Sequence, residues 1–261
     1  MIELKDVSYS YSGITALQNI NLCIEKGEAV AFMGPNGSGK STLLKLINGI
    51  MSPDRGSYTF NGEEITQNKL SNTKFAKHFH QQIGFVFQNS DTQLFCADVY
   101  DEIAFGPRQM GLNESEVDTR VNDCLNLLNI QDFKSRPPYH LSGGEKRKVA
   151  IACVLSLNPE VLVLDEPLSG LDPRTQRWLV EFLVHLNKSG KTIITSTHDL
   201  ELVSEVSNRA ILFGESHTIV ADMPSEKLLG DIELLKEVNL VDLHYQNHGR
   251  TNHKQIDDNN F

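Results

Sequence analysis

The sequence has no long apolar run. Its most apolar stretches, such as Val161–Leu164, are interrupted within a few residues, whereas a membrane-spanning helix needs about 20 apolar residues. Residues Met1–Asp6 also lack the basic segment followed by an apolar run that marks a secretory signal. We therefore expect a chain that does not cross a bilayer itself and that stays in the cytosol.

Cysteine is scarce, and acidic residues outnumber basic ones. The cysteines, Cys23, Cys96, Cys124 and Cys153, show no C-x-x-C spacing, which argues against a zinc or redox site and predicts buried, reduced thiols. Lys and Arg number 24 against 34 Asp and Glu, a net charge of −10. Nucleic acid is not an expected partner, because its binding depends on clustered Lys and Arg; a local basic patch stays compatible with this charge.

The remaining composition is that of a globular protein, with 39% hydrophobic and 22% charged residues in 261. This length fits one large domain, or one domain with lobes. The first part of the chain has β-like runs at Ile2–Tyr9, Ile14–Ile24 and Ala29–Phe32, and helical apolar spacing follows from Ser41 to Ile50. A strand therefore leads through a glycine loop into a helix.

The middle of the chain predicts a parallel α/β core. A strand is expected at Ile83–Phe87 and a helix at Glu114–Ile130. Val161–Leu164 and Thr192–Ser196 are apolar without alternation, as parallel strands covered on both faces are. A helical stripe, Trp178–Leu186, lies between them, and this strand–helix–strand order indicates a three-layer arrangement.

The core is expected to end near residue 222. After it, the spacing of Leu228, Leu229, Ile232 and Leu235 predicts a short helical extension within residues 223–247. The polar residues 248–261 are expected to be disordered, because they offer too little apolar surface to fold.

A phosphate-binding loop is indicated between the third strand and the first helix. Gly34–Ser41 fits G-x-x-x-x-G-K-[ST]. In such a loop the free N–H groups at the helix start surround the phosphates, while Lys40 neutralises the outer phosphates and Ser41 supplies an oxygen to Mg²⁺. The alternative is a glycine turn that only caps a helix. The dinucleotide motif G-x-G-x-x-G is not matched, because Thr42 stands where its last glycine would be.

Two further sites accompany the loop. Val161–Leu164 ends in Asp165 and Glu166; Asp165 would hold Mg²⁺ through water, and Glu166 would orient or deprotonate an attacking water. The alternative is a pair of solvated acids at a strand end. Leu141–Glu145 precedes a helical run, so Ser142 would cap the helix and the following glycines would expose backbone donors. Taken alone, this could be just a cap.

Together these motifs resemble the ATP-binding subunit of ABC transporters. The resemblance covers roughly residues 2–222 and rests on Gly34–Ser41, Gln88, Leu141–Glu145, Val161–Glu166, Ser169–Asp172 and His198 in this order. It implies a P-loop NTPase of the ABC type in the α/β class. Such a domain, here residues 1–222, has a mixed β-sheet core, an N-terminal antiparallel β lobe and an inserted α-helical subdomain at about 90–158. Two subunits would pair head to tail and enclose two ATP molecules.

The resemblance also implies a role for individual residues. It assigns nucleotide binding to Tyr11, Asn36, Gly37, Ser38, Gly39, Lys40, Ser41 and Thr42, with Mg²⁺ held by Ser41, Gln88 and Asp165. It assigns catalysis to Glu166, His198 and Gln88, contact with the partner's ATP to Ser142, Gly143, Gly144 and Glu145, and the dimer interface to Asp172.

Several of these residues have simpler interpretations. Tyr11 would stack on adenine, but Tyr9 competes for that role, and either tyrosine could be a core or turn residue. Gln88 could be a polar strand end and His198 a structural histidine. Glu145 departs from the glutamine that this family has more often; we expect it to leave the donors of the Ser-Gly-Gly turn intact, with an open effect on affinity for the partner's nucleotide.

A second, narrower resemblance concerns the segments Phe87–Phe95 and Asp101–Pro107, which are similar to the ATPases of energy-coupling factor (ECF) importers. It implies a peripheral subunit on the cytoplasmic face of the membrane, with an integral scaffold protein and a substrate-binding membrane protein as partners. Leu94 and Phe95 would form one wall of a groove for a helix of the membrane partner. Core packing explains these two residues equally well.

The cargo is expected to be nickel or cobalt, with vitamins as the next alternative. His244, His248 and His253 would fit a metal cargo, but their irregular spacing defines no coordination geometry. A soluble ABC ATPase of the assembly type and a scaffold that does not hydrolyse ATP are the other interpretations. The coiled-coil insertion of repair members and the duplication of translation members are both missing from the sequence.

Overall fold

The chain forms two β-sheets, and the computed structural model describes residues 1–241. A four-stranded sheet has the order β2-β1-β4-β5, and a six-stranded sheet has the order β10-β9-β3-β8-β7-β6. The strands are β1 (Ile2–Tyr11), β2 (Ile14–Ile24), β3 (Ala29–Met33), β4 (Arg55–Phe60), β5 (Glu63–Glu64), β6 (Ile83–Val86), β7 (Val161–Asp165), β8 (Thr192–Ser196), β9 (Arg209–Phe213) and β10 (Ile219–Pro224).

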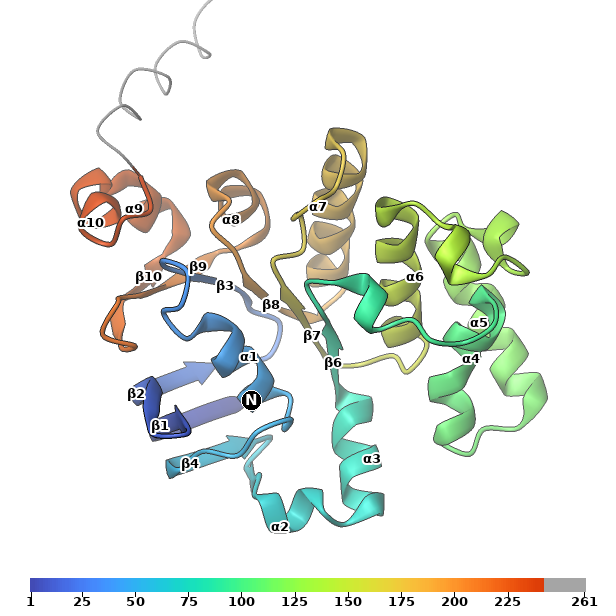
Figure 1. Ribbon diagram of the computed structural model, residues 1–261, viewed down its shortest axis with the longest axis horizontal. Coiled ribbons are helices and arrows are strands. Elements are labelled where there is room, and N and C mark those ends of the chain that lie inside the picture. Colours follow the sequence, from blue (N-terminus) through green and yellow to red (C-terminus); the bar gives the residue numbers. More distant parts are fainter. Residues whose placement is uncertain (242–261) are drawn as a thin grey trace, which may run out of the picture.

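Helices surround the larger sheet, and in Figure 1 α4, α5 and α6 gather to one side of β6. The helices are α1 (Lys40–Ile47), α2 (Gln67–Leu70), α3 (Thr73–Gln82), α4 (Val99–Gln109), α5 (Glu114–Leu127), α6 (Gly143–Leu155), α7 (Pro173–Lys188), α8 (Leu200–Val206), α9 (Ser225–Gly230) and α10 (Ile232–Glu237). Within residues 1–241, no helix combines the length and apolarity needed to cross a membrane.

The six-stranded sheet is mixed, as predicted. Strands β9, β3, β8, β7 and β6 pair in parallel, and β10 pairs with β9 antiparallel. Every residue of β3, β7 and β8 is buried, which explains why these strands show no alternation in the sequence. Because parallel strands all end at the same edge, the loops after β3, β7 and β8 meet there.

The four-stranded sheet is the antiparallel lobe, and one of its faces is open to solvent. Along β2, Ile20, Leu22 and Ile24 are buried, and Cys23 between them is exposed. The prediction of buried cysteines is therefore wrong for Cys23, because successive side chains of a strand point to opposite faces. Cys124 is buried as expected. The remaining cysteines, Cys96 and Cys153, are partly buried.

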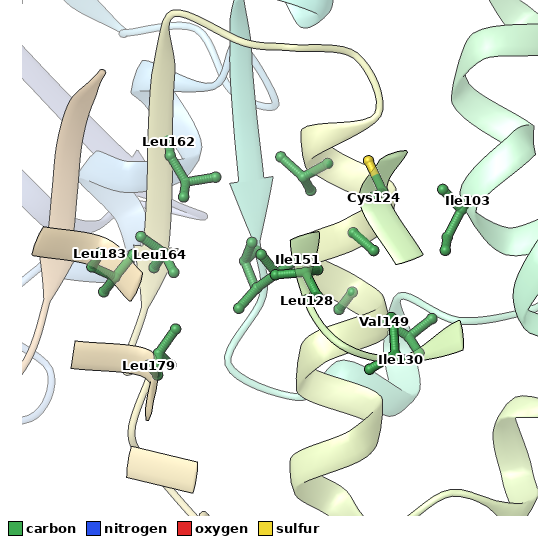
Figure 2. Close-up of a cluster of buried hydrophobic side chains, with 14 of the residues drawn as sticks. Ile103, Cys124, Leu128, Ile130, Val149, Ile151, Leu162, Leu164, Leu179 and Leu183 are labelled. Carbon is green, nitrogen blue, oxygen red and sulfur yellow. The ribbon is translucent and has the colours of Figure 1, made fainter. Parts of the chain in front are cut away.

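One hydrophobic core joins α4, α5 and α6 to the sheet. Figure 2 shows Ile103, Cys124 and Ile151 from these helices in one cluster with side chains from β7 and α7. The contact with β6 depends on Gly84, because a Cβ there would lie 2.1 Å from Cγ1 of Val154. A larger residue at position 84 would push α6 away from the sheet. The helices α4–α6 fall within the 90–158 range expected for the helical subdomain.

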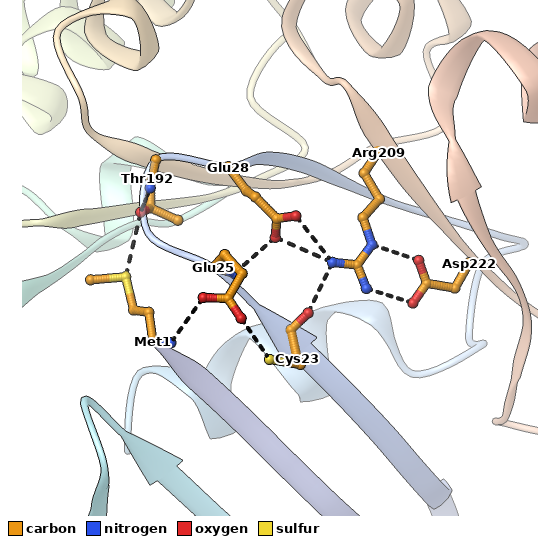
Figure 3. Close-up of polar contacts among 8 residues, drawn as sticks. Met1, Cys23, Glu25, Glu28, Thr192, Arg209 and Asp222 are labelled. Atoms are coloured by element: carbon orange, nitrogen blue, oxygen red, sulfur yellow. Dashed lines mark hydrogen bonds and ion pairs between the residues drawn. The ribbon is translucent and has the colours of Figure 1, made fainter.

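A partly buried arginine joins the antiparallel lobe to the larger sheet (Figure 3). Arg209 of β9 donates to both carboxylate oxygens of Asp222 at 2.6 and 2.7 Å, to the carbonyl of Cys23 at 2.9 Å, and to Glu28 at 3.2 and 3.3 Å. These hydrogen bonds raise the pKa of the guanidinium, with the bond to Asp222 as the main cause. Planar two-point pairing of this kind holds strands in one relative position.

The segment after β10 forms two short helices, where a single extension was expected. Asp231 ends α9 and its side chain accepts a hydrogen bond from the N–H of Leu234 at 3.1 Å, which starts α10. Leu228 and Leu235 pack on β3 and β9 side chains such as Met33. The predicted tail, residues 248–261, and His244 lie outside the described residues.

Candidate active site

The phosphate loop runs from β3 into α1 and is enclosed by two other parts of the chain. At Gly39 (φ 105°) a Cβ would lie 2.3 Å from the carbonyl oxygen of Ala16, and at Gly34 (φ 142°) it would lie 2.5 Å from that of Phe213. Only glycine fits these positions, because any side chain would collide with backbone and the φ values are unfavourable for other residues. The glycines of the motif therefore let the loop pack between β2 and β9.

Lys40 is held inside this loop. Its ammonium donates to the carbonyl oxygens of Gly34 at 2.7 Å and Pro35 at 2.9 Å, and the residue is buried. Burial lowers the pKa of Lys40, and the negative charges of Glu166 and Asp165 oppose that effect. A buried cation next to free backbone N–H groups is a site that attracts phosphate.

Asp165 lies at the end of β7 and connects two hydroxyl groups. Its Oδ1 accepts a hydrogen bond from Ser41 Oγ at 3.0 Å, and a second one from Ser196 Oγ of β8. Asp165 is buried. Carboxylate, hydroxyl and amide oxygens are the ligands that Mg²⁺ prefers, so Ser41, Asp165 and the nearby Gln88 fit the predicted magnesium site in donor chemistry.

Glu166 follows directly and has a strained backbone. Its φ is 43°, in the left-handed region, and its N–H donates to the Ser196 carbonyl at 3.0 Å. The carboxylate is only 13% exposed, and its oxygens lie 3.0 and 3.1 Å from Nδ1 of His198. Strain at a polar strand end is typical of functional residues. The ends of β7 and β8 therefore bring Glu166 and His198 together.

These residues surround one cavity of about 460 Å³. Predicted residues that line it are Tyr11, Asn36, Gly37, Gly39, Lys40, Ser41, Thr42, Gln88, Glu166 and His198, and the cavity is completed by Ile14, Thr15, Ala16 and His217. Tyr9 does not line it, which favours Tyr11 over Tyr9 for the predicted stacking role. Ser38 is buried beneath the loop, and its hydroxyl finds no partner among the described residues.

The predicted signature forms a separate group that does not line this cavity. Ser142 caps α6, and the N–H of Glu145 donates to its Oγ at 3.4 Å. In return the Glu145 carboxylate accepts from the N–H of Ser142 at 2.7 Å and from its Oγ at 2.8 Å. These bonds lower the pKa of Glu145. The expectation that Glu145 leaves the donors of this turn intact is therefore wrong for Ser142, because the carboxylate can accept both of its hydrogens.

Asp172 lies close to the signature. It caps α7 by accepting hydrogen bonds from Thr175 Oγ1 at 2.6 Å and from the Thr175 N–H at 3.1 Å. A Cβ at Gly144 would lie 2.9 Å from the same Thr175 Oγ1. Thr175 therefore joins Asp172 to the start of α6, and these two predicted sites form one surface of the chain.

Two residues of the site were given no role in the sequence analysis. Arg147 of α6 is buried and donates to the carbonyl oxygens of Phe87 at 2.7 Å and Gln88 at 2.6 Å. It thereby ties the signature helix to the strand end that carries Gln88. The sequence offered one signal for its burial. Arg147 lies three residues before Ala150 and seven before Val154, on the buried side of the helix. His217 lies in the turn before β10 and belongs to no motif.

Comparison with known proteins decides the family. The sequence model of the ABC transporter family matches residues 17–169. This chain belongs to the ABC transporter family. It is an ATP-binding subunit of that family, and its chemistry is ATP hydrolysis coupled to transport.

Relatives within the ABC family cover nearly the whole chain. An ABC transporter ATP-binding protein of Clostridium acetobutylicum is 56% identical over 92% of this chain and 100% of its own length. The nickel import ATP-binding protein LarO of Lactiplantibacillus plantarum is 46% identical over 85% of this chain and 92% of its own. The energy-coupling factor transporter ATP-binding protein EcfA of Methanothermobacter thermautotrophicus is 43% identical over 92% and 76%.

Solved structures of ABC proteins share the fold. The structure of cbiO1 from Clostridium perfringens, part of the ABC transporter complex cbiONQ, matches with a TM-score of 0.79 at 36% identity, over 92% of this chain and 94% of that one. A dimeric ATP-binding cassette in a post-hydrolysis state, bound to ADP and Pi, matches with a TM-score of 0.77 at 30% identity, over 86% and 99%.

The Glu145 contact predicts a pH-dependent contribution to stability. The folded state holds the pKa of this carboxyl below its ordinary value of 4.5, so the stabilisation is complete above the unfolded pKa and is lost as the pH falls through the folded one. We expect Glu145→Gln to lower the free energy of unfolding by about 0.5 kcal/mol at pH 7, and by much less near pH 3, because Gln keeps an acceptor oxygen for the capping bonds but loses the charge at the helix start. Urea unfolding at both pH values measures this; an equal loss at both would contradict it.

Proposed function

We propose that this chain is the ATP-hydrolysing subunit of an ECF-type importer. Two copies, or this chain and a paralogue, would bind each ATP between the cavity of one subunit and the Ser142–Gly144 turn of the other. The observation that carries this proposal is that one chain has two helix starts with glycine-rich motifs, of which only the one at Lys40 lines the cavity. At the other, Glu145 accepts the hydrogens of Ser142, so the N–H groups of Gly143 and Gly144 would be the donors that meet the partner's ATP. Head-to-tail pairing is an arrangement that uses both. The dimeric state of the similar cassette supports it.

The proposed reaction follows from the contacts in the cavity. The Glu166 carboxylate takes a proton from a water whose oxygen attacks the γ-phosphorus, while the bond to the β–γ bridging oxygen breaks and ADP leaves with that electron pair. His198 holds Glu166 through the contact at its Nδ1, and Lys40 offsets the charge of the outer phosphates. Mg²⁺, when bound at Ser41, Gln88 and Asp165, would neutralise further phosphate charge.

A membrane partner is proposed to bind at a second cavity of about 260 Å³. Phe95 and Phe105 form its exposed wall: their side chains are 69% and 44% exposed, and their ring centroids lie 5.0 Å apart. Leu94 instead packs against the core, in line with the simpler interpretation of that residue. The cavity also includes Phe87, whose carbonyl accepts a hydrogen bond from Arg147. A helix bound there would therefore touch the strand end that leads to Gln88.

Nickel or cobalt is the proposed cargo. The similarity to a nickel import ATP-binding protein supports this choice over a vitamin. Within the described part of the chain, no cluster of three His, Cys, Asp or Glu side chains would hold a metal ion. In this proposal the cargo is recognised by a membrane partner, and this subunit lies at the cytoplasmic face of the membrane.

The hydrolytic role predicts that Glu166→Gln traps ATP. Removing the carboxylate should slow hydrolysis by about 100-fold or more and leave the cavity able to bind. In the presence of Mg²⁺ and ATP, we expect this variant to form a stable dimer in size-exclusion chromatography with light scattering. Lys40→Ala should bind ATP at least about tenfold more weakly and stay monomeric. Hydrolysis at the parent rate by Glu166→Gln would refute the assigned role.

If the membrane partner binds at this second cavity, the docking groove, a charge at its exposed wall should weaken the contact. Phe95→Asp should reduce the amount of membrane partner that is purified with the chain by about tenfold, because a carboxylate would have to be buried in the contact. Its ATPase activity in solution should be unchanged. Leu127→Asp is the matched control, since Leu127 is an exposed apolar residue on α5 outside this cavity. If both variants recover the partner equally, the groove is not the docking site.

The cargo is tested by uptake in cells that carry the complete transporter. We expect accumulation of radioactive nickel or cobalt to fall by about tenfold or more when the chain is replaced by the Lys40→Ala variant, because binding of ATP would be lost. Uptake of labelled vitamins should not change. Loss of vitamin uptake alone would move the proposal to a vitamin importer.

Recovery of the chain from gently lysed cells without any membrane protein would favour the assembly-type alternative.

A further inference from the structure

His217 lines the nucleotide cavity and belongs to none of the sequence motifs. It lies in the turn between β9 and β10, and the residue lines the cavity together with Ala16 and Gly37. The turn directly follows Phe213, whose carbonyl packs against Gly34 of the phosphate loop. The position of His217 is therefore tied to the loop that would hold the phosphates.

The backbone around His217 is fixed on both sides. Its N–H donates to the carbonyl of Gly214 at 3.1 Å, and its own carbonyl accepts from the N–H of Gln18 at 2.9 Å. The residue has a φ of 61°, a conformation that a non-glycine residue adopts only when the surroundings hold it there. The bond to Gln18 places His217 beside β2, two residues from Ala16 of the cavity wall.

The two ring nitrogens are in different environments. Nδ1 is shielded from solvent and has no hydrogen-bond partner among the described residues, although the residue as a whole is partly exposed and lines the cavity. A buried N–H without an acceptor is more costly and rarer than an unpaired acceptor. In the neutral ring the hydrogen is therefore favoured on Nε2, the nitrogen that is left to meet a ligand.

We propose that the Nε2–H of His217 donates a hydrogen bond to an acceptor on the nucleoside half of ATP. This inference rests on the proposed function, because it assumes that the cavity holds ATP. The nucleoside half is assigned because His217 is attached to β2, where Thr15 and Ala16 line the cavity next to Tyr11 and Ile14. The residues for the γ-phosphate, Glu166 and His198, come instead from the ends of β7 and β8.

The donor gives the site a preference for a nucleotide over a bare polyphosphate chain. A neutral hydrogen bond contributes about three- to tenfold in affinity. The acceptor is a ring nitrogen of the base or an oxygen of the ribose. Both are hydrogen-bond acceptors of the nucleoside, and both are missing from inorganic tripolyphosphate.

The experiment measures the affinity of ATP and of tripolyphosphate by isothermal titration calorimetry with Mg²⁺, in the Glu166→Gln background. His217→Gly removes the ring without backbone strain, because glycine accepts a φ of 61°. His217→Gln places an amide N–H near the position of Nε2. We expect the Gly variant to bind ATP about three- to tenfold more weakly with tripolyphosphate unchanged, and the Gln variant to recover most of the loss.

Each other outcome has a definite meaning. Equal weakening of ATP and tripolyphosphate would place the contact on the phosphates and overturn the assignment, as would unchanged ATP affinity in the Gly variant. A Gln variant no better than the Gly variant would reduce His217 to a packing role. If the parent binds no ATP, or if Lys40→Ala binds it equally well, the proposed function itself fails. If the expected result is obtained, titrations with 2′-deoxy-ATP and 7-deaza-ATP test the 2′-oxygen of the ribose and N7 of the base as the acceptor.

Discussion

The structure depends on the absence of side chains at two points of the phosphate loop. Gly34 and Gly39 leave so little room that a Cβ would overlap the carbonyl oxygens of Phe213 and Ala16. The antiparallel lobe, the loop and β9 can meet only because these positions are glycine. This close packing turns the N–H groups of the loop, the ammonium of Lys40 and the wall of β2 toward one cavity.

The side of the cavity with the proposed catalytic residues depends on the register of neighbouring strands. Asp165 of β7 is paired with Ser196 of β8, so the carboxylate, the hydroxyl and the following Glu166 and His198 lie at one sheet edge. A shift of one residue would turn these side chains to the opposite face. Arg147 extends the arrangement by holding the carbonyls before and at Gln88 from α6. The proposed docking groove, Gln88 of the nucleotide cavity and the signature helix are therefore linked through the hydrogen bonds of one side chain.

Much of the fold and of the candidate site could be predicted from local sequence patterns, and the errors have physical causes. The first helix begins at Lys40 and ends at Ile47, close to the expected range, because glycine and lysine chemistry marks its start. Cys23 was misplaced because a short thiol carries no sign of the face to which its strand turns it. The contact between Glu145 and Ser142 was missed because it depends on side-chain conformation. The role of His217 depends on a turn whose partner, Gln18, is far away in the sequence.

The sequence by itself determined the fold class, the phosphate loop, the acidic strand end and the order of the motifs. These are local patterns, in which residue type and spacing carry the chemistry over a few positions. Only the tertiary structure decided which residues share a cavity, that Tyr11 lines it and Tyr9 does not, and that the signature lies outside it. Such facts depend on which distant segments pack together, and packing is set by the shapes of many side chains at once.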